Sequence, residues 1–306
     1  MRIAVTGTSG QLALSLGERA AAVAGVSVIR LGRPELDLLR PETVAPALAA
    51  CGADIVVNAA AYTAVDRAES EPALAHAVNA TGAQAVAAAA AGLGLPVIQI
   101  STDYVFDGTA PDPYAETAPT GPVSVYGASK LAGEGLVAAA NPRHLIVRTA
   151  WVYSPFGGNF VSTMLRLAAT RDTIQVVDDQ LGNPTSALDL ADGLVAAARR
   201  ALYPGFSAWG IYHMAGSGAA SWAGFAAQVL DESRRSGGPY ATIEPIPGAQ
   251  FVTAARRPTN SRLDTARAAS VFGSGLPDWR LSVAAVVRRL AADSRAAAAE
   301  AAPGRI

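Results

Sequence analysis

Short apolar runs rich in β-branched residues alternate along the chain with longer stretches rich in alanine and leucine. The apolar runs predict strands, at residues 2–6, 26–31, 54–58, 96–100, 144–148 and 211–215. The longer stretches predict helices, at residues 11–24, 41–50, 72–93, from about 124, within 156–171 and at 188–202. Strands that alternate with helices in this way indicate an α/β fold built on a parallel sheet.

The first predicted strand leads directly into a glycine loop, Gly7 to Ala13, at the start of the first helix. Gly7 and Gly10 would let the backbone turn tightly and approach a pyrophosphate at the helix N-terminus, and Ala13 takes the third small position. The spacing is G-x-x-G-x-x-A. A glycine loop between a strand and a helix is typical of dinucleotide-binding proteins, and the alternative is a purely structural turn.

Arg30 and Arg33 stand at the end of the second predicted strand, where dinucleotide folds that prefer NAD carry an acidic residue. A guanidinium suits a 2′-phosphate, so these residues favour NADPH over NADH unless both are simply solvated. The third strand ends in the small-residue loop 59–63, at the sheet edge where ligands bind in open α/β sheets. Small side chains there would leave room for a ribose and a nicotinamide.

Polar groups also follow the fourth strand, which ends at Ser101, Thr102 and Asp103. Their position makes them active-site candidates, although the same residue types favour turns and helix caps. Downstream, Tyr126 and Lys130 are spaced i, i+4, so a helix would bring a phenol and an ammonium within reach. The cation is expected to lower the pKa of the phenol and make it a proton-transfer group. The spacing alone is weak evidence, since many helices carry it by chance.

The composition excludes several other classes of protein. Charged residues make up 16% of the 306 residues and the net charge is −1, which argues against a nucleic-acid surface. The single cysteine, Cys51, cannot form an internal disulfide. The uncharged stretch 72–102 is long enough to span a bilayer, but Gly92, Gly94 and Pro96 divide it into a buried helix and a strand. With no signal-peptide pattern at the N-terminus, we expect a cytoplasmic protein without a membrane partner.

Four motifs occur in the order in which they occur in the extended short-chain dehydrogenase/reductases, and the chain resembles that family. They are the glycine loop, residues 58–61, residues 101–103 and Tyr126-x-x-x-Lys130. The chain is similar, more narrowly, to the dTDP-4-dehydrorhamnose reductase family. That similarity rests on residues 64–72, 101–106, 125–127, 130–134, 148–153, 159–160, 179–185 and 255–263. It extends from Met1 to about Trp279. The resemblance implies a Rossmann-type doubly wound parallel sheet with a smaller α/β substrate-binding domain.

The resemblance also implies roles for individual residues. Cofactor contacts would come from the glycine loop, the second strand end, the small-residue loop and the helical Tyr–Lys pair: Gly7, Gly10, Gln11, Leu12, Arg30, Arg33, Asp37, Leu38, Ala61, Tyr62, Thr63, Tyr126 and Lys130. Tyr126 would donate the proton, Lys130 would bind the nicotinamide ribose and assist Tyr126, and Thr102 would bond the reacting oxygen. The substrate contacts would be Thr102, Asp103 and Trp151.

Some family members are reported to hold Mg²⁺ through glutamates at a homodimer contact. The matching positions in this chain are Ser15 and Leu188, which lack carboxylates, and this puts both the metal and that form of dimer in doubt. Thus no metal ligand is assigned.

The second half is expected to bind the sugar nucleotide. We divide the chain into a dinucleotide-binding domain, 1–150, continued by parts of 175–217, and a mainly sugar-nucleotide-binding domain, 151–306, that interleaves with it. Arg256, Arg257 and Arg262 could bond a diphosphate or form surface ion pairs, and Arg256 is taken as a substrate contact. The alanine-rich stretch from about residue 291 is expected to fray.

The expected activity is therefore NAD(P)H-dependent reduction of the C4 keto group of dTDP-4-dehydro-6-deoxy-L-mannose to dTDP-L-rhamnose. One alternative is a C4-ketoreductase of another dTDP-deoxysugar, which would share every motif. Another is a catalytically silent nucleotide-binding subunit, similar to the β subunit of methionine adenosyltransferase. The intact Thr102, Tyr126 and Lys130 set argues against the silent subunit.

Overall fold

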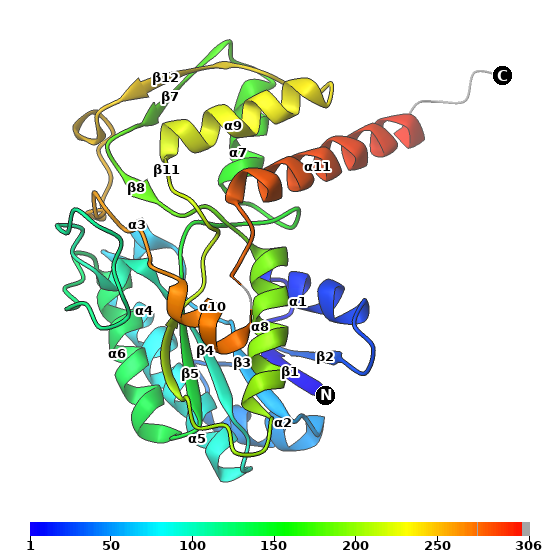
Figure 1. Cartoon of the computed structure of the whole chain (residues 1–306), viewed down its shortest axis with the longest axis vertical. Coiled ribbons are helices and arrows are strands. Elements are labelled where there is room, and N and C mark those ends of the chain that lie inside the picture. Colours follow the sequence, from blue (N-terminus) through cyan, green and yellow to red (C-terminus); the bar gives the residue numbers. More distant parts are fainter. Residues whose placement is uncertain (274, 302–306) are drawn as a thin grey trace.

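A six-stranded parallel sheet forms the centre of the computed structural model, which describes residues 1–273 and 275–301 (Figure 1). Its strands are β1 (Arg2–Thr6), β2 (Ser27–Leu31), β3 (Ile55–Asn58), β4 (Val97–Thr102), β5 (His144–Thr149) and β10 (Gly210–His213). They lie in the order β10-β5-β4-β3-β1-β2, and every neighbouring pair is parallel. This order confirms the predicted doubly wound fold, with its switch point between β1 and β3.

Helices cover both faces of this sheet, which explains why the central residues of its strands are mostly apolar. On one face α1 (Gln11–Ala21) and α8 (Ala187–Ala201) pack against each other and share a core with Val5, Val57 and Tyr212. On the other face lie α2 (Val44–Cys51), α5 (Ala83–Gly92) and α6 (Val125–Ala140), whose core includes Val56 and Val97. Figure 1 shows the two sets on opposite sides of the strands.

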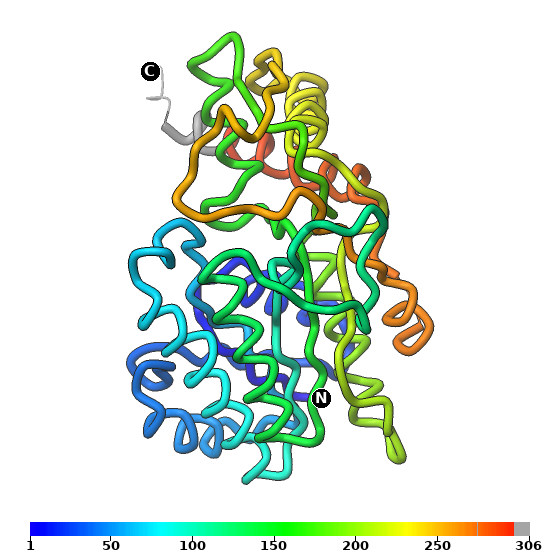
Figure 2. The backbone as a smooth tube through the Cα atoms, turned by 90° about the vertical axis from the view of Figure 1, so that its left-hand side faces the viewer, coloured from blue at the N-terminus to red at the C-terminus, as the bar shows by residue number. Residues whose placement is uncertain are grey.

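A smaller part lies beyond the carboxyl ends of these strands, at the top of Figures 1 and 2. It contains α7 (Phe160–Ala168), α9 (Trp222–Arg235), α11 (Trp279–Ala301) and the parallel pair β7 (Thr173–Val177) and β12 (Thr242–Ile246). These elements bury a second core that includes Tyr153, Phe225 and Trp279. The chain leaves this part after β7, returns to the sheet with α8 and β10, and then crosses back.

The remaining elements are shorter. They are η1 (Pro41–Thr43), α3 (Val65–Ala68), α4 (Pro72–His76), η2 (Ala77–Gly82), η3 (Asp103–Val105), β6 (Val152–Tyr153), β8 (Leu181–Gly182), β9 (Thr185–Ser186), β11 (Ala220–Ser221), η4 (Gly248–Gln250) and α10 (Ala266–Phe272).

Two sequence expectations differ from the structure. The stretch 72–93 is not one regular helix, because the π-helical segment η2 separates α4 from α5. The stretch from residue 291, expected to fray, continues α11 to Ala301, and residues 302–306 lie outside the described part. Over the described residues, no helix has the length and apolar character needed to cross a membrane.

Candidate active site

A cavity of about 820 Å³ opens at the carboxyl ends of β1, β3 and β4, beside the switch point of the sheet. Most of the predicted site residues line it. These are Gly7, Gly10, Gln11, Leu12, Arg33, Asp37, Leu38, Ala61, Tyr62, Thr63, Thr102, Asp103, Tyr126, Lys130 and Trp151. Arg30 and Arg256 are not among the lining residues. The structure therefore brings together groups from six separate segments of the chain at one edge of the sheet.

At one end of the cavity, the glycine loop leaves the N-terminus of α1 open. Gly7 adopts a positive φ of 99°, a conformation that side chains disfavour. Gly10 is the N-cap and supplies no side-chain acceptor for the first amide groups of α1, and a Cβ there would meet nothing within 4 Å. Open space in front of unfilled N–H donors suits an anion. The loop thus fits the pyrophosphate of a dinucleotide.

Arg30 and Arg33 differ in their placement. Arg33 lines the cavity, whereas Arg30 is exposed and its Nη1 donates to the carbonyl of Thr8 at 3.2 Å. Arg30 therefore braces the glycine loop from outside. Of the two arginines, Arg33 is the one whose position suits a 2′-phosphate inside the cavity.

The small-residue loop is fixed by Asn79, whose role the sequence analysis missed. The Asn79 amide accepts from the Tyr62 N–H at 2.8 Å and donates to the Tyr62 carbonyl at 3.0 Å and to Ser129 Oγ at 2.9 Å. Asn79 lies in η2, and single π-helical turns are frequent at functional sites. One amide thus joins the cofactor-side loop to α6. The available signal was an asparagine within an uncharged, alanine-rich helix.

Helix α6 carries Tyr126 and Lys130 and is held unusually close to the end of β4. Its N-cap Ser124 accepts from the Gly127 N–H at 3.2 Å, as the expected helix start requires. A Cβ on Gly127 would lie 2.2 Å from the Tyr104 carbonyl oxygen, so only glycine permits this approach. Lys130 Nζ donates to the Ile100 carbonyl at 2.6 Å.

The pKa of the Tyr126 phenol is raised, whereas the sequence predicted that it would be lowered. Burial raises the pKa of Tyr126 to about 12, and the Asp103 carboxylate adds to this, while the Thr102 hydroxyl acts in the opposite direction. Burial also lowers the pKa of Lys130 to about 8. The prediction was wrong because desolvation of the phenolate dominates, and the Lys130 ammonium, which bonds the Ile100 carbonyl, makes no resolved contribution to the pKa of Tyr126. At neutral pH the phenol therefore carries its proton, as a proton donor must.

Asp103 is a buried carboxyl group that is only partly satisfied. It is 2% exposed, and its Oδ1 accepts from Thr102 Oγ1 at 3.0 Å. Its Oδ2 has no hydrogen-bond partner among the described residues. Burial raises the pKa of Asp103 to about 6. An unpaired polar atom beside an open cavity is the expected state of a group that binds a ligand.

We expect Asp103→Asn to change the pH dependence of stability. The pKa of Asp103 in the folded protein lies above its ordinary value, so the protonated carboxyl favours folding. This contribution to the stability of the native protein is present near pH 4 and is lost as the pH rises through about 6. In urea unfolding, the free energy of unfolding of the variant relative to that of the native protein should rise by about 2 kcal/mol between pH 4 and pH 7.5. Asp54→Asn, at an exposed carboxylate, is the control. Parallel curves for Asp103→Asn and the native protein would contradict this assignment.

Trp151 enters the cavity in a strained backbone conformation, with a φ of 47°. Its ring stacks flat on Trp222, with centroids 3.5 Å apart and planes 7° from parallel. A Cβ on Gly182 would lie 2.4 Å from the Trp151 ring, so glycine is required there. Trp222 also lines the cavity and was missed, because nothing in the sequence links it to Trp151. The indole pair presents a rigid apolar surface of the kind that packs on a sugar.

The three arginines near residue 260 do not converge on the cavity. Arg257 forms an ion pair with Asp66 at 2.7 Å, and Arg262 donates to Asn260 Oδ1 at 2.9 Å. Arg256 is exposed at the surface and lies outside the cavity lining, so the structure does not place it as the substrate contact that the sequence predicted. The ion pair of Arg257 with Asp66 instead ties the loop at residues 255–257 to α3. Residues 259 and 261, which follow this loop, form backbone hydrogen bonds with Leu181 of β8.

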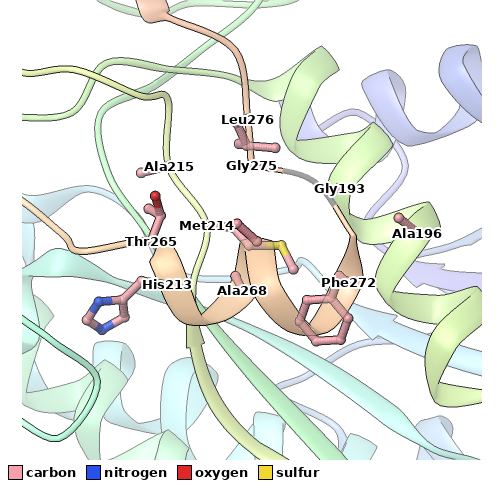
Figure 3. Close-up of a pocket in the computed structure, with 11 residues that line it drawn as sticks. Gly193, Ala196, His213, Met214, Ala215, Thr265, Ala268, Phe272, Gly275 and Leu276 are labelled. Atoms are coloured by element: carbon pink, nitrogen blue, oxygen red, sulfur yellow. The ribbon is translucent and has the colours of Figure 1, made fainter.

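Two further observations concern sites other than the main cavity. Figure 3 shows a pocket of about 10 Å³ between α8 and α10, bordered by His213, Met214 and Leu276, which has room for about one water molecule. No group of three or more His, Cys, Asp or Glu side chains that could hold a metal occurs in the described ranges. Ser15 lies buried on α1, and Leu188 lies on α8.

Comparison with known proteins identifies consistent relatives. The model of the family described as RmlD substrate binding domain matches residues 1–292. A dTDP-4-dehydrorhamnose reductase of Sinorhizobium fredii is 52% identical over 94% of this chain and 97% of its own length. The reductase of the same name from Escherichia coli K12 is 42% identical over 95% of this chain and 98% of its length.

Solved structures agree with these relatives. The dTDP-4-dehydrorhamnose reductase of Clostridium acetobutylicum has a TM-score of 0.87 at 35% identity, covering 95% of this chain and 99% of that one. The Bacillus anthracis reductase, solved in complex with NADP, has a TM-score of 0.86 at 34% identity, covering 93% and 98%. Both likenesses extend over the sheet and the smaller part of the fold.

Proposed function

The chain belongs to the RmlD substrate binding domain family, and from this premise we propose that it is a dTDP-4-dehydrorhamnose reductase. The reaction is the NADPH-dependent reduction of the C4 keto group of dTDP-4-dehydro-6-deoxy-L-mannose to dTDP-L-rhamnose. The observation that carries this proposal is the convergence of Thr102, Tyr126 and Lys130 with the open glycine loop on one cavity.

The cavity suits both a dinucleotide and a sugar nucleotide. The N-terminus of α1, with Gly10 and Gln11, would bind the cofactor pyrophosphate, and the loop 61–63 would lie along its ribose and nicotinamide. When bound, NADPH supplies the hydride that the reduction requires. The stacked Trp151 and Trp222 would pack on the sugar. These positions support the proposal that residues 1–150 and parts of 175–217 bind the cofactor and that residues 151–306 mainly bind the sugar nucleotide.

The chain's own residues account for the proton and for the developing charge. As the keto oxygen gains negative charge, the Tyr126 phenol transfers its proton to it and forms the C4 hydroxyl. The Thr102 hydroxyl, which donates to Asp103 Oδ1 in the structure, would turn to donate its hydrogen bond to the same oxygen and so favour the transition state. The Lys130 ammonium stabilises the phenolate that remains, because opposite charges interact strongly in a buried site. Asp103, with a free oxygen beside Thr102, would accept from a sugar hydroxyl.

Product identification tests the proposal directly. Purified protein would be incubated with NADPH and dTDP-4-dehydro-6-deoxy-L-mannose, and the product identified by NMR. We expect dTDP-L-rhamnose, with NADPH consumed in equal amount. Incubation with one or two other dTDP-4-keto sugars is the control for substrate choice. Preferred turnover of one of those sugars would overturn the substrate assignment, and no NADPH oxidation with any of them would overturn the enzymatic function.

We expect Arg33→Ala to weaken the preference for NADPH. The guanidinium lines the cavity and would pair with the 2′-phosphate, and a charge-assisted pair contributes about 1.5–3 kcal/mol. The KM for NADPH should rise by more than about tenfold while that for NADH changes little. Arg40→Ala, at an exposed arginine outside the cavity lining, is the control. Equal effects on the two cofactors would contradict the role of Arg33.

We also place the reaction in the cytoplasm, with the dTDP-sugar as partner and without a nucleic acid. The nearly neutral charge of the chain supports the second point, since a nucleic-acid surface is strongly basic.

A further inference from the structure

Resting on the proposed function, we propose that Glu134, locked in place by Arg148 and Ser101, is a positioning residue that keeps Lys130 charged and correctly placed. Ser101 lines the cavity, whereas Glu134 and Arg148 belong neither to the predicted site nor to the cavity lining. The proposal rests on a buried network beneath the site and on the position of Glu134 one helical turn after Lys130.

Glu134 and Arg148 form a fully buried ion pair. Arg148 Nε donates to Glu134 Oε1 at 2.9 Å, and Arg148 Nη2 donates to Oε2 at 2.7 Å. Their side chains are 4% and 2% exposed. Ser101 Oγ donates to Glu134 Oε1 at 2.6 Å. The remaining nitrogen, Arg148 Nη1, has no partner in the described chain, so the pair is not simply an optimised structural contact.

This network is joined to Lys130 through the end of β4. Lys130 donates to the carbonyl of Ile100, the residue immediately before Ser101. Ser101 lies opposite Arg148 in the β4–β5 register, and Thr102 follows it. Two side chains of α6, Lys130 and Glu134, therefore attach to successive residues of one strand. The strand end that carries Thr102 and the helix that carries the phenol are held in a fixed relation.

The charge of Glu134 acts on Lys130 as well. Burial removes water from the ammonium and lowers the pKa of Lys130, whereas the Glu134 carboxylate raises it. Titratable side chains on α6 and on the elements packed against it are Tyr126, Glu134, Asp66, Arg67, His76, Asp103, Tyr104, His144 and Arg148. Of these, Glu134 is the one whose charge supports the ammonium. Without it, the buried lysine would lose its proton closer to neutral pH.

The composition makes this testable, because Lys130 is the only lysine among 24 basic Lys and Arg residues. Protein labelled with ¹³C at lysine Cε gives one NMR signal, whose pH titration reports Lys130 alone. We would titrate the native protein, Glu134→Gln, and the double variant Glu134→Gln with Arg148→Met. The double variant removes both charges and so avoids an unpaired buried guanidinium. Glu18→Gln is the control, since Glu18 makes a similar two-bond pair with Arg289 at the surface.

We expect the midpoint near pH 8 in the native protein and in Glu18→Gln, and a midpoint lower by about 1 unit in both Glu134 variants. The alkaline limb of kcat should move to lower pH by the same amount. An unchanged midpoint in a folded Glu134 variant would overturn the proposal. The NMR titration needs no substrate, so it tests Glu134 even if the native protein fails to reduce the proposed sugar.

Discussion

Tyr126→Phe is expected to lower kcat by about 10²–10⁴-fold, the usual contribution of a positioned proton donor. The variant keeps the ring that packs edge-on against Tyr104 with centroids 5.9 Å apart, so the site should keep its shape. NADPH binding, measured by fluorescence titration, should therefore change by less than about threefold. The loss should appear in kcat and in kcat/KM alike, since the proton is transferred only in the transition state.

Tyr104→Phe is the matched control for this experiment. Tyr104 is the neighbouring phenol of the same cavity, and burial raises its pKa as well. It does not share a helix face with Lys130, so its removal should leave most of the turnover. Near-native turnover in Tyr126→Phe, or a larger loss in Tyr104→Phe, would show that another group supplies the proton.

Gly133→Ala is expected to destabilise the fold by about 3 kcal/mol, at the upper end of the range for overpacking. A Cβ at this position would lie 2.1 Å from the carbonyl oxygen of Asn79, a backbone atom that cannot rotate away. The clash would push α6 away from η2 and so disturb the Asn79 amide that links the loop at Tyr62 to Ser129. Chemical unfolding and NADPH binding should both deteriorate.

Gly135→Ala, two residues further along the same helix, provides the control. It is exposed, and a Cβ there would meet nothing within 4 Å. Since alanine favours a helix over glycine, this variant should be more stable by about 0.5–1 kcal/mol. If the two substitutions had effects of the same sign and size, the close packing of α6 against η2 would not be a stabilising feature.

The sheet and the cavity lining could be predicted because both follow from local patterns. Apolar runs buried on two faces give strands, and polar residues placed just after parallel strands meet at one edge. Gly7 and Thr102 come from such positions, Tyr126 and Lys130 come from a helical i, i+4 spacing, and all four line the cavity. A further local signal was available, since a chain that otherwise uses arginine carries its single lysine at position 130.

What could not be predicted depends on distances between remote segments. Trp222 faces Trp151 across 71 residues, and no periodicity connects them. Asn79 acts through a π-helical turn that the alanine-rich pattern does not reveal. The raised pKa of Tyr126 follows from burial, which requires the packed structure rather than the spacing to Lys130. Arg256 was chosen by charge, and its exposed position emerges only from the fold.

The return of the chain to the sheet after β7 has a consequence for protein engineering. A fragment that ends at residue 150 would lack α8 and β10, which cover α1 and pair with β5. It would expose an unpaired strand edge and an apolar helix face, and such surfaces promote aggregation. Grafting the sugar-binding part of a relative onto this chain therefore requires exchanging at least two separate segments on either side of 187–213. A single crossover at residue 150 would join α8 and β10 of one parent to the sheet of the other.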